Sequence, residues 1–311
     1  MEIHFKLSEL LKFLKDELGF DQLPATKHQG TDLLIAGFSS IYHTKQNTLS
    51  WMTTQLLDWK TINASIIICS KKADVPKDTN IVFIPVENPR NIFALVLRKF
   101  HPKNPAVGIS STAIIGDNCK IGENVYVGHY TTVGNNVTIG DNTQIYSNVT
   151  IHDNICIGSN CVIHSGVVIG ADGFGYEQDT EGHSFKIPHI GRVIIEDYVE
   201  IGSNTCVARG VLADTLIKKF VKIGNLTHIS HNVSIGENTM ITHLAHIGGS
   251  IKIDENCWIA PGATYKQGLS IGKNSLTGLG AVVIRDIEPF DIVAGVPAKP
   301  IKKISINDKE G

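Results

Sequence analysis

An aliphatic residue returns at every sixth position of this chain, without a slip from Ile109 to Ile169. Gly, Asn or Asp usually follows it within two or three residues, as in IGDNCK and IGENVY. A period of six fits neither the repeat of about 3.6 residues in a helix nor the alternation of a strand. It predicts three-sided coils in which each short strand turns one aliphatic inward and Gly or Asn takes the corners at positive φ. Such coils bury their shared core only by stacking on neighbours.

The repeat breaks twice, and each break indicates a loop ejected from the stack. The first lies near 170–190, in GADGFGYEQDTEGHSFKIPHIGR, and the second near 208–216, in ARGVLADTL. The period returns at Ile217 and continues past Ile259, so the repeated domain spans 106–300. Because stacked coils tolerate few insertions, we expect these loops to carry function rather than decorate the surface.

Residues 1–105 lack the repeat and predict a small α/β domain. LSELLKFLKDEL and NPRNIFALVLRKF have the pattern of helices, and ASIIICS and TNIVFIPV that of buried strands. The prolines of HPKNPAVG suit a linker at the boundary. At the other end, residues 301–311 predict a short polar tail. The fold class is therefore mainly β, with an α/β domain in front.

Composition excludes several classes of function. A net charge of −2 argues against binding nucleic acid through bulk electrostatics. No apolar run approaches the roughly 18 residues of a membrane span, and the N-terminus has no signal-peptide pattern. The six cysteines are scattered without a CxxC pair, which predicts reduced thiols in the cytoplasm and no zinc knuckle.

Four motifs carry a resemblance to a known family: GADGFGY, KIPHIGRVII, RGVLADT and HISHNVSIG. They resemble the UDP-3-O-acylglucosamine N-acyltransferases of lipid A synthesis, up to about residue 240. The hexapeptide repeat resembles the left-handed parallel β-helix of hexapeptide acyltransferases, and 37–52 resembles that family's uridine-binding domain. The resemblance implies a homotrimer with active sites between neighbouring coils.

The same resemblance implies roles for particular residues. His231 matches the family's catalytic histidine, a general base that takes a proton from the sugar amine. Trp51 falls where an aromatic ring stacks on uracil, although it also fits the core of a strand. For the acceptor side we single out Phe174, Tyr176, Lys186 and His189, and for the acyl or pantetheine site His243 and His246, which also suit a solvent face. No metal site is predicted, because no carboxylate or cysteine cluster accompanies the histidines.

The C-terminal coils point to a different donor. IAPGATY, GLGAVVIRDI and VAGVPAKPIKK resemble the coenzyme A-dependent sugar acetyltransferases. The lipid A family's second histidine is absent, and Ala208 and Gly224 stand where that family usually carries Asp. No sequence remains for the helical extension that docks acyl carrier protein in that family. Residues expected at the coenzyme are Gly248, Gly249, Ala260, Gly262, Gly280, Lys299 and Lys302, with a glycine amide as donor to the oxyanion.

The sequence thus predicts an N-acetyltransferase that moves acetyl from acetyl-CoA, a co-substrate rather than a bound cofactor, to the amine of a UDP- or dTDP-linked amino sugar. Its expected place is bacterial surface polysaccharide synthesis. One alternative is a UDP-3-O-(3-hydroxyacyl)glucosamine N-acyltransferase of lipid A synthesis that uses acyl carrier protein. Another is a zinc-dependent hexapeptide carbonic anhydrase or a non-catalytic scaffold on the same fold.

Overall fold

The computed structural model describes residues 4–20, 32–53, 58–76, 79–102 and 105–304. The chain divides into two compact units, residues 1–104 and residues 105–310. Each unit has its own core of buried aliphatic and aromatic side chains.

The N-terminal unit is built on a parallel sheet of three strands, β3 (Leu49–Met52), β4 (Ile66–Ser70) and β5 (Val82–Val86), in that order. The remaining elements are β1 (Phe5–Lys6), α1 (Leu7–Asp16), β2 (Leu34–Ile35), the 3-10 helix η1 (Trp59–Thr61) and α2 (Pro89–Phe100). Helix α2 begins where Asn88 accepts a hydrogen bond from the N–H of Asn91 and a proline takes the first position. The central strand β4 is buried along nearly its whole length, as its run of isoleucines predicts.

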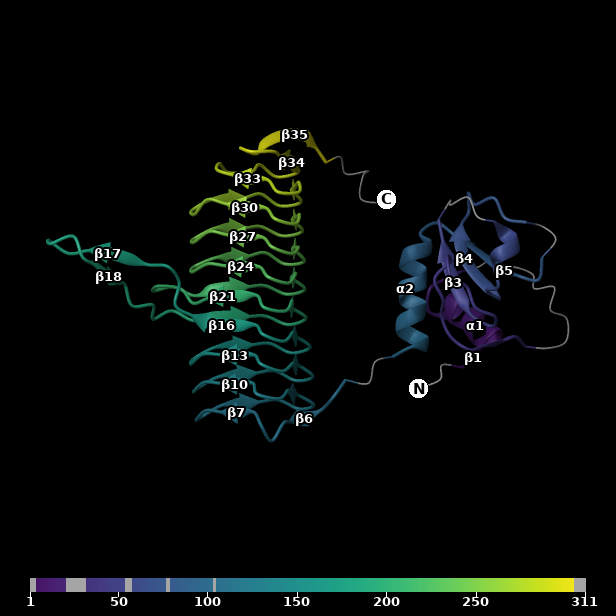
Figure 1. Ribbon diagram of the computed structural model, residues 1–311, viewed down its shortest axis with the longest axis horizontal. Coiled ribbons are helices and arrows are strands. Elements are labelled where there is room, and N and C mark those ends of the chain that lie inside the picture. Colours follow the sequence, from purple (N-terminus) through teal and green to yellow (C-terminus); the bar gives the residue numbers. More distant parts are fainter. Residues whose placement is uncertain (1–3, 21–31, 54–57, 77–78, 103–104, 305–311) are drawn as a thin grey trace. The chain divides into compact units, whose positions relative to one another are not determined.

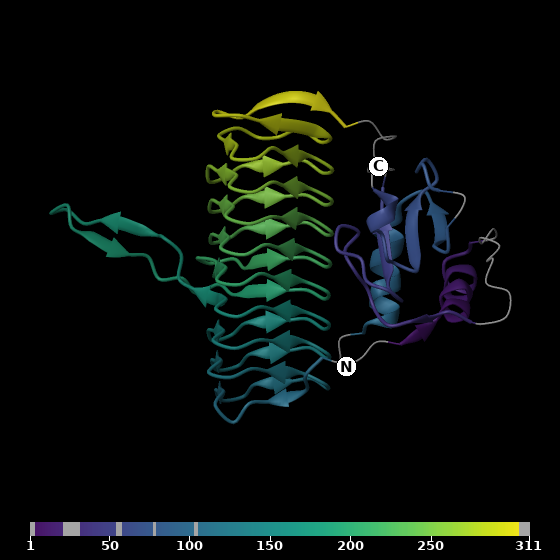
Figure 2. The ribbon, with the colours of Figure 1, turned by 45° about the vertical axis from the view of Figure 1, so that its right-hand side comes forward.

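The second unit is a β-solenoid in which short strands stack into three sheets that run along its length (Figures 1 and 2). The nine-stranded sheet contains β7 (Ile114–Ile115), β10 (Thr132–Val133), β13 (Thr150–Ile151), β16 (Val168–Ala171), β21 (Cys206–Ala208), β24 (His228–Ile229), β27 (His246–Ile247), β30 (Thr264–Tyr265) and β33 (Val282–Val283). The eight-stranded sheet contains β8 (Lys120–Ile121), β11 (Thr138–Ile139), β14 (Cys156–Ile157), β19 (Val193–Ile195), β22 (Thr215–Ile217), β25 (Ser234–Ile235), β28 (Lys252–Ile253) and β31 (Ser270–Ile271). The eleven-stranded sheet contains β6 (Gly108–Ile109), β9 (Tyr126–Val127), β12 (Gln144–Ile145), β15 (Val162–Ile163), β20 (Glu200–Ile201), β23 (Lys222–Ile223), β26 (Met240–Ile241), β29 (Trp258–Ile259), β32 (Leu276–Thr277), β34 (Asp291–Ala294) and β35 (Lys299–Lys303).

The core of the solenoid confirms the six-residue period and adds a second buried position to it. Ile139 and Ile145 are buried as the repeat predicts, and Val137, two residues before Ile139, is buried as well. Where this second position is polar, its side chain finds a partner inside: the Thr143 hydroxyl donates to the carbonyl of Gly158 at 2.8 Å. Ile109 remains 49% exposed, because β6 ends its sheet and has only β9 beside it.

The corners between sheets adopt the left-handed backbone that the recurring asparagines predict. Asn136 has a φ of 56° and Asn232 a φ of 60°, a conformation that Asn tolerates better than most residues. Side chains next to these positions link successive coils: Asn135 Oδ1 accepts from the N–H of Asp117 at 2.8 Å, and Asp153 Oδ1 accepts from the N–H of Asn135 at 2.7 Å. We call such a series of side-chain to backbone bonds a corner ladder.

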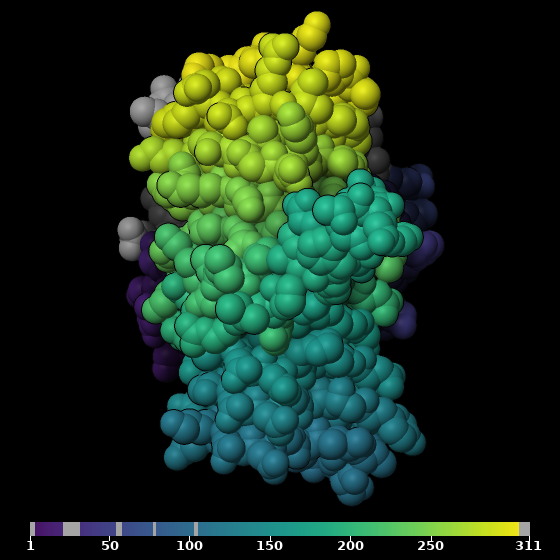
Figure 3. All heavy atoms as spheres, turned by 90° about the vertical axis from the view of Figure 1, so that its left-hand side faces the viewer, coloured from purple at the N-terminus to yellow at the C-terminus, as the bar shows by residue number. Residues whose placement is uncertain are grey.

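The two breaks in the repeat are loops outside the stack. In the first, β17 (Tyr176–Gln178) and β18 (Ser184–Lys186) pair antiparallel in a hairpin that projects from the solenoid (Figures 1 and 2) and stands out from the face shown in Figure 3. The second, residues 209–214, stays close to the coils.

The C-terminal end differs from the predicted polar tail. Residues Lys299–Lys303 form β35, which pairs antiparallel with β34, whereas residues 305–311 lie outside the described part. An antiparallel strand at this place covers the edge of the last coil, which an open parallel sheet would expose.

Candidate active site

A groove of about 530 Å³ runs along the nine-stranded sheet. Its floor is formed by the outward side chains of β24, β27, β30 and β33, which are His228, His246, Thr264 and Val282. Three steps of about 4.8 Å between neighbouring strands give this floor a length of about 14 Å. The corner after the sheet forms one wall and carries His231.

His231 fits at this corner because two glycines leave room for its ring. A Cβ built on Gly249 would lie 2.7 Å from His231 Nε2, and one built on Gly173 would lie 2.8 Å from Cδ2. On the side of the other ring nitrogen, Nδ1 lies 3.1 Å from Oδ1 of Asn232. Gly249, Gly173 and Asn232 therefore surround the imidazole on three sides. Gly249 is also part of the groove wall.

His189 lies beside His231 rather than at the surface. Only 5% of it is exposed, and its ring meets that of His231 in a T-shaped contact with centroids 5.5 Å apart. Nδ1 lies 2.8 Å from the carbonyl oxygen of Ile187, whereas the buried Nε2 has no hydrogen-bond partner among the described residues. The residue predicted to touch substrate thus packs under the loop that carries Gly173.

The floor nearest His231 consists of two stacked imidazoles. The rings of His228 and His246 lie 5.3 Å apart with their planes 8° from parallel. The pKa of His228 lies below its ordinary value, first because burial disfavours the charged imidazolium and then because His246 lies beside it. This part of the floor is therefore polar, and at His228 it favours the neutral imidazole over the imidazolium.

Lys266 lines the groove, and the sequence analysis did not identify it. It is the only Lys or Arg among the described residues of the lining, so it gives the groove its positive charge. The residue follows Tyr265, the inward residue of its coil. Its place in the repeat was readable, but the repeat alone does not tell which face of the solenoid bears a groove.

The loop GADGFGY reaches the groove through Phe174, which is 89% exposed and forms part of the lining. Tyr176 packs against Phe174, with ring centroids 5.0 Å apart. Lys186 lies 5.3 Å from the ring of Tyr176, donates to the carbonyl of Gly173 at 3.3 Å and pairs with Asp172 at 3.5 Å. In this arrangement Lys186 braces the loop.

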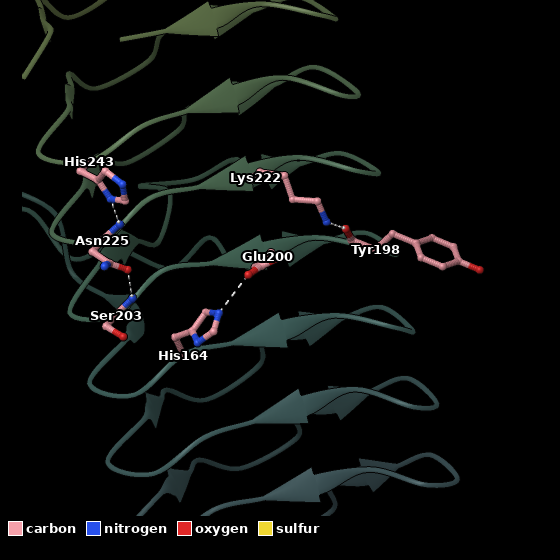
Figure 4. A network of polar contacts seen from close by, with 7 residues as sticks. All are labelled: His164, Tyr198, Glu200, Ser203, Lys222, Asn225 and His243. Carbon is pink, nitrogen blue, oxygen red and sulfur yellow. Dashed lines mark hydrogen bonds and ion pairs between the residues drawn. The ribbon is translucent and has the colours of Figure 1, made fainter. Parts of the chain in front are cut away.

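His243 belongs to a corner ladder (Figure 4) and is not among the residues that line the groove. Its Nδ1 accepts from the N–H of Asn225 at 3.0 Å, just as Asn225 Oδ1 accepts from the N–H of Ser203 at 2.8 Å. Figure 4 also shows His164 bonded to Glu200, at 3.0 Å, on the eleven-stranded sheet. His243 therefore takes the place that Asn or Asp holds elsewhere in the ladders.

The residues predicted at coenzyme A do not come together. Gly248 and Gly249 line the groove, but Ala260 is buried on the eleven-stranded sheet. Gly262 and Gly280 stack at the next corner with φ of 72° and 61°. Lys299 lines a separate pocket of about 290 Å³ beside β34, and Lys302 is exposed on β35.

Trp51 lies in the N-terminal unit and lines a pocket of about 520 Å³ there. The pocket has an aromatic wall that also includes Phe38, Tyr42 and Phe93. The rings of Trp51 and Phe93 lie 6.1 Å apart, so Trp51 is both packed and accessible from the pocket.

Within the described ranges no group of three or more His, Cys, Asp or Glu side chains is arranged to hold a metal ion. Among the same residues, no helix has the length and apolar character needed to cross a membrane.

Comparison with known proteins agrees with the fold. The family model described as Bacterial transferase hexapeptide (six repeats) matches residues 112–143 and 136–171. A UDP-3-O-acylglucosamine N-acyltransferase from Campylobacter lari is 38% identical over 305 residues, covering 94% of this chain and 92% of that protein. A protein of the same name from Helicobacter hepaticus is 54% identical over 166 residues, and the chain spans about half of it, 51%. The crystal structure of a UDP-N-acetylglucosamine acyltransferase from Bacteroides fragilis matches with a TM-score of 0.57 and 28% identity, over 63% of this chain and 74% of that one.

These relatives overturn the prediction of an acetyl-CoA-dependent acetyltransferase for surface polysaccharides. The likeness to UDP-3-O-acylglucosamine N-acyltransferases is not confined to the first 240 residues but extends along 94% of the chain. The C-terminal motif VAGVPAKPIKK covers the end of β34 and all of β35, which pair antiparallel at the end of the solenoid. The motif therefore belongs to the end of the solenoid and is no evidence for a particular thioester donor. The chain belongs to the family of UDP-3-O-acylglucosamine N-acyltransferases, a family of acyltransferases.

Proposed function

We propose that this chain transfers a 3-hydroxyacyl group from an acyl carrier protein to the amine of UDP-3-O-acylglucosamine. The amine nitrogen attacks the thioester carbonyl, the new C–N bond forms, and the C–S bond breaks. His231 takes the proton that the nitrogen loses and returns it to the departing thiolate.

The six free cysteines suit a cytoplasmic enzyme.

The observation that carries the proposal is the change of polarity along the groove. The floor is imidazole at His228 and His246 and becomes aliphatic at Val282, while Ile284 lines the same end. A long acyl chain needs an apolar surface away from the reacting carbonyl, and an acetyl group does not. The carbonyl therefore belongs at His231 and the chain along the later coils.

A break in the corner ladder supports the stabilisation of the oxyanion. Gly249 stands one coil beyond His231, where an Asn or Asp would accept the N–H of His231. Within the part of the chain that the structure describes, the N–H groups of His231, Gly248 and Gly249 donate to no partner. Gly248 and Gly249 line the groove. An amide aimed at the oxygen of the tetrahedral intermediate lowers the barrier by about 3 kcal/mol.

Lys266 and the pocket of Trp51 suit the charged and aromatic parts of the substrates. A lysine in the groove favours a phosphate group, which the phosphopantetheine arm of the carrier and the UDP of the acceptor both carry. The aromatic wall beside Trp51 suits a uracil ring.

We also propose that the active form is a homotrimer. Met240 and Trp258 are neighbours on the eleven-stranded sheet, and both are more than a third exposed. A second copy of the chain would bury this apolar surface.

The test compares donors with UDP-3-O-acylglucosamine as acceptor and detects the N-acylated product by mass spectrometry. We expect product with 3-hydroxyacyl carrier protein and none with acetyl-CoA. His231→Gln should lower turnover at least about a hundredfold, because the general base is lost. His164→Gln, which alters a histidine bonded to Glu200 on another sheet, is the matched control. Transfer from acetyl-CoA alone, or full turnover by His231→Gln, would refute the proposal.

A further inference from the structure

The second ejected loop holds the corner that carries His231. The N–H of Val211 donates to Oδ1 of Asn232 at 3.0 Å, and Nδ2 of Asn232 donates to the carbonyl of Ala213 at 2.9 Å. The loop is tight enough that a Cβ on Gly210 would overlap the carbonyl oxygen of Ala213. At the base of the loop, Thr215 Oγ1 accepts from the backbone N–H of Asn232 at 2.9 Å.

These backbone partners fix which way the amide of Asn232 faces. A backbone N–H can only donate and a carbonyl can only accept, so Oδ1 lies toward Val211 and Nδ2 toward Ala213. A flipped amide would place donor against donor and acceptor against acceptor. The orientation of this side chain is therefore imposed by the loop.

The fixed amide in turn decides the tautomer of His231. Nδ1 lies 3.1 Å from Oδ1 of Asn232, and because Oδ1 is an acceptor, Nδ1 must carry the hydrogen. A neutral imidazole has one N–H, so Nε2 keeps its lone pair. Nε2 is the atom beside Gly249 in the wall of the groove, where a general base needs it.

We infer that Asn232 is a positioning residue that holds His231 in its Nδ1–H tautomer, and that the insertion 209–214 exists in part to orient Asn232. The inference rests on the proposed role of His231 as general base. A neutral amide here does what a carboxylate or an asparagine does beside the histidine of other hydrolytic and acyl-transfer sites.

The variant that tests it is Asn232→Gly. Asn232 has a φ of 60°, which glycine adopts without strain, so the change removes the side chain while the backbone conformation stays available. Asn136→Gly is the matched control, since Asn136 has a φ of 56° at the same corner of an earlier coil. Asn232→Asp keeps an acceptor oxygen beside Nδ1 of His231, but it adds a negative charge and replaces the donor to the carbonyl of Ala213 with an oxygen.

Two measurements separate positioning from a structural role. The ¹⁵N spectrum of histidine-labelled protein, with His231→Gln to assign the signals, reports which nitrogen of His231 carries the proton without any turnover. We expect the proton on Nδ1 in the wild type and in Asn232→Asp, and a mixture of tautomers in Asn232→Gly. In the transfer assay Asn232→Gly should lower kcat about tenfold or more with little change in KM, and Asn232→Asp should recover most of it.

Asn136→Gly should match the wild type in both measurements. An unchanged His231 tautomer in Asn232→Gly would overturn the inference, whatever happens to kcat. An unchanged kcat together with a changed tautomer would also overturn it, because the tautomer would then not matter to catalysis. If the wild type transfers no acyl group, the proposed function fails, yet the spectrum still decides whether Asn232 sets the tautomer.

Discussion

Replacing Gly249 by alanine should damage catalysis much more than folding. A Cβ added at Gly249 would stand 2.7 Å from both Cε1 and Nε2 of His231, and the next nearest atom is also in that ring. Ordinary contacts of a Cβ begin at about 3.4 Å, so the imidazole has to move by close to 1 Å. The φ of Gly249 lies outside the left-handed region, so the backbone accepts alanine there. The side chain, and not the coil, absorbs the change.

The size of the effect follows from this displacement. A misplacement of about 1 Å in a catalytic group costs on the order of a hundredfold in rate. A rotated surface-accessible ring costs the folded state about 1 kcal/mol, which is small against the free energy of unfolding. Gly249→Ala should therefore lower kcat about a hundredfold and leave the melting temperature within a few degrees of the wild type.

Gly268→Ala is the control, because it should lower stability and leave kcat unchanged. Gly268 lies at the same corner one coil further on, where a Cβ meets nothing within 4 Å but φ is 78°. Alanine there should destabilise by about 1 kcal/mol because the left-handed backbone is strained, while kcat stays unchanged. Steady-state kinetics with 3-hydroxyacyl carrier protein and thermal unfolding of both variants give the answer. Wild-type kcat in Gly249→Ala would refute the reasoning that places the reaction beside Gly249.

Three further expectations concern charge and burial. Lys266→Gln should raise KM for the phosphate-bearing substrates about tenfold at low salt, with kcat nearly unchanged. The difference in KM between the variant and the wild type should shrink as added salt screens the charge of the lysine. Equal KM values at low salt would contradict this expectation. Burial raises the pKa of the Cys161 thiol to about 11, so only about a thousandth of it is thiolate at pH 8 and iodoacetamide should label it only after unfolding, as peptide mass spectrometry would show. Hydrogen bonds from Arg192 hold the pKa of Asp214 below its ordinary 3.8; this stabilisation is present above that value and is lost as pH falls through the folded pKa. Asp214→Asn should therefore cost less than about 1 kcal/mol of unfolding free energy at pH 7, and denaturant titrations should show that cost vanishing at acid pH.

Much of the solenoid was predictable because one physical constraint repeats along it. A side chain must face inward once per short strand, and the spacing from Ile139 to Ile145 reports that directly. Residues three repeats apart then lie on neighbouring coils, so the pairing of His228 with His246 on adjacent strands follows from the period. The second inward position was harder to read, since valine, threonine, cysteine and alanine all fill it on different coils.

The surroundings of His231 were less predictable because they come from outside the period. Gly249 lies one coil away and could be paired with His231 by counting. Gly173 and His189 come from the ejected loop, whose path across the coils no repeat encodes. The resemblance suggested His231 as the base, which stays a prediction, and it also led to the acetyl-CoA reading that the relatives contradict, because a motif at the end of the solenoid was taken as evidence about the thioester.

The candidate site lies where the corner ladder is interrupted. The interruption loses a hydrogen bond, and the bonds of the loop 209–214 compensate for it. On the early coils of this corner a side-chain oxygen accepts the N–H of Asp117 and that of Asn135, and each such bond contributes on the order of 1 kcal/mol. Gly249 has no side-chain oxygen to form that bond, which leaves the N–H of His231 without an acceptor among the described residues and leaves room for the ring of His231. The bonds of Asn232 to the loop 209–214 restore order at the corner from outside the coil. In the mechanism that we propose, the interrupted ladder and the inserted loop act together: the first leaves amide donors for the oxyanion, and the second holds His231 beside them.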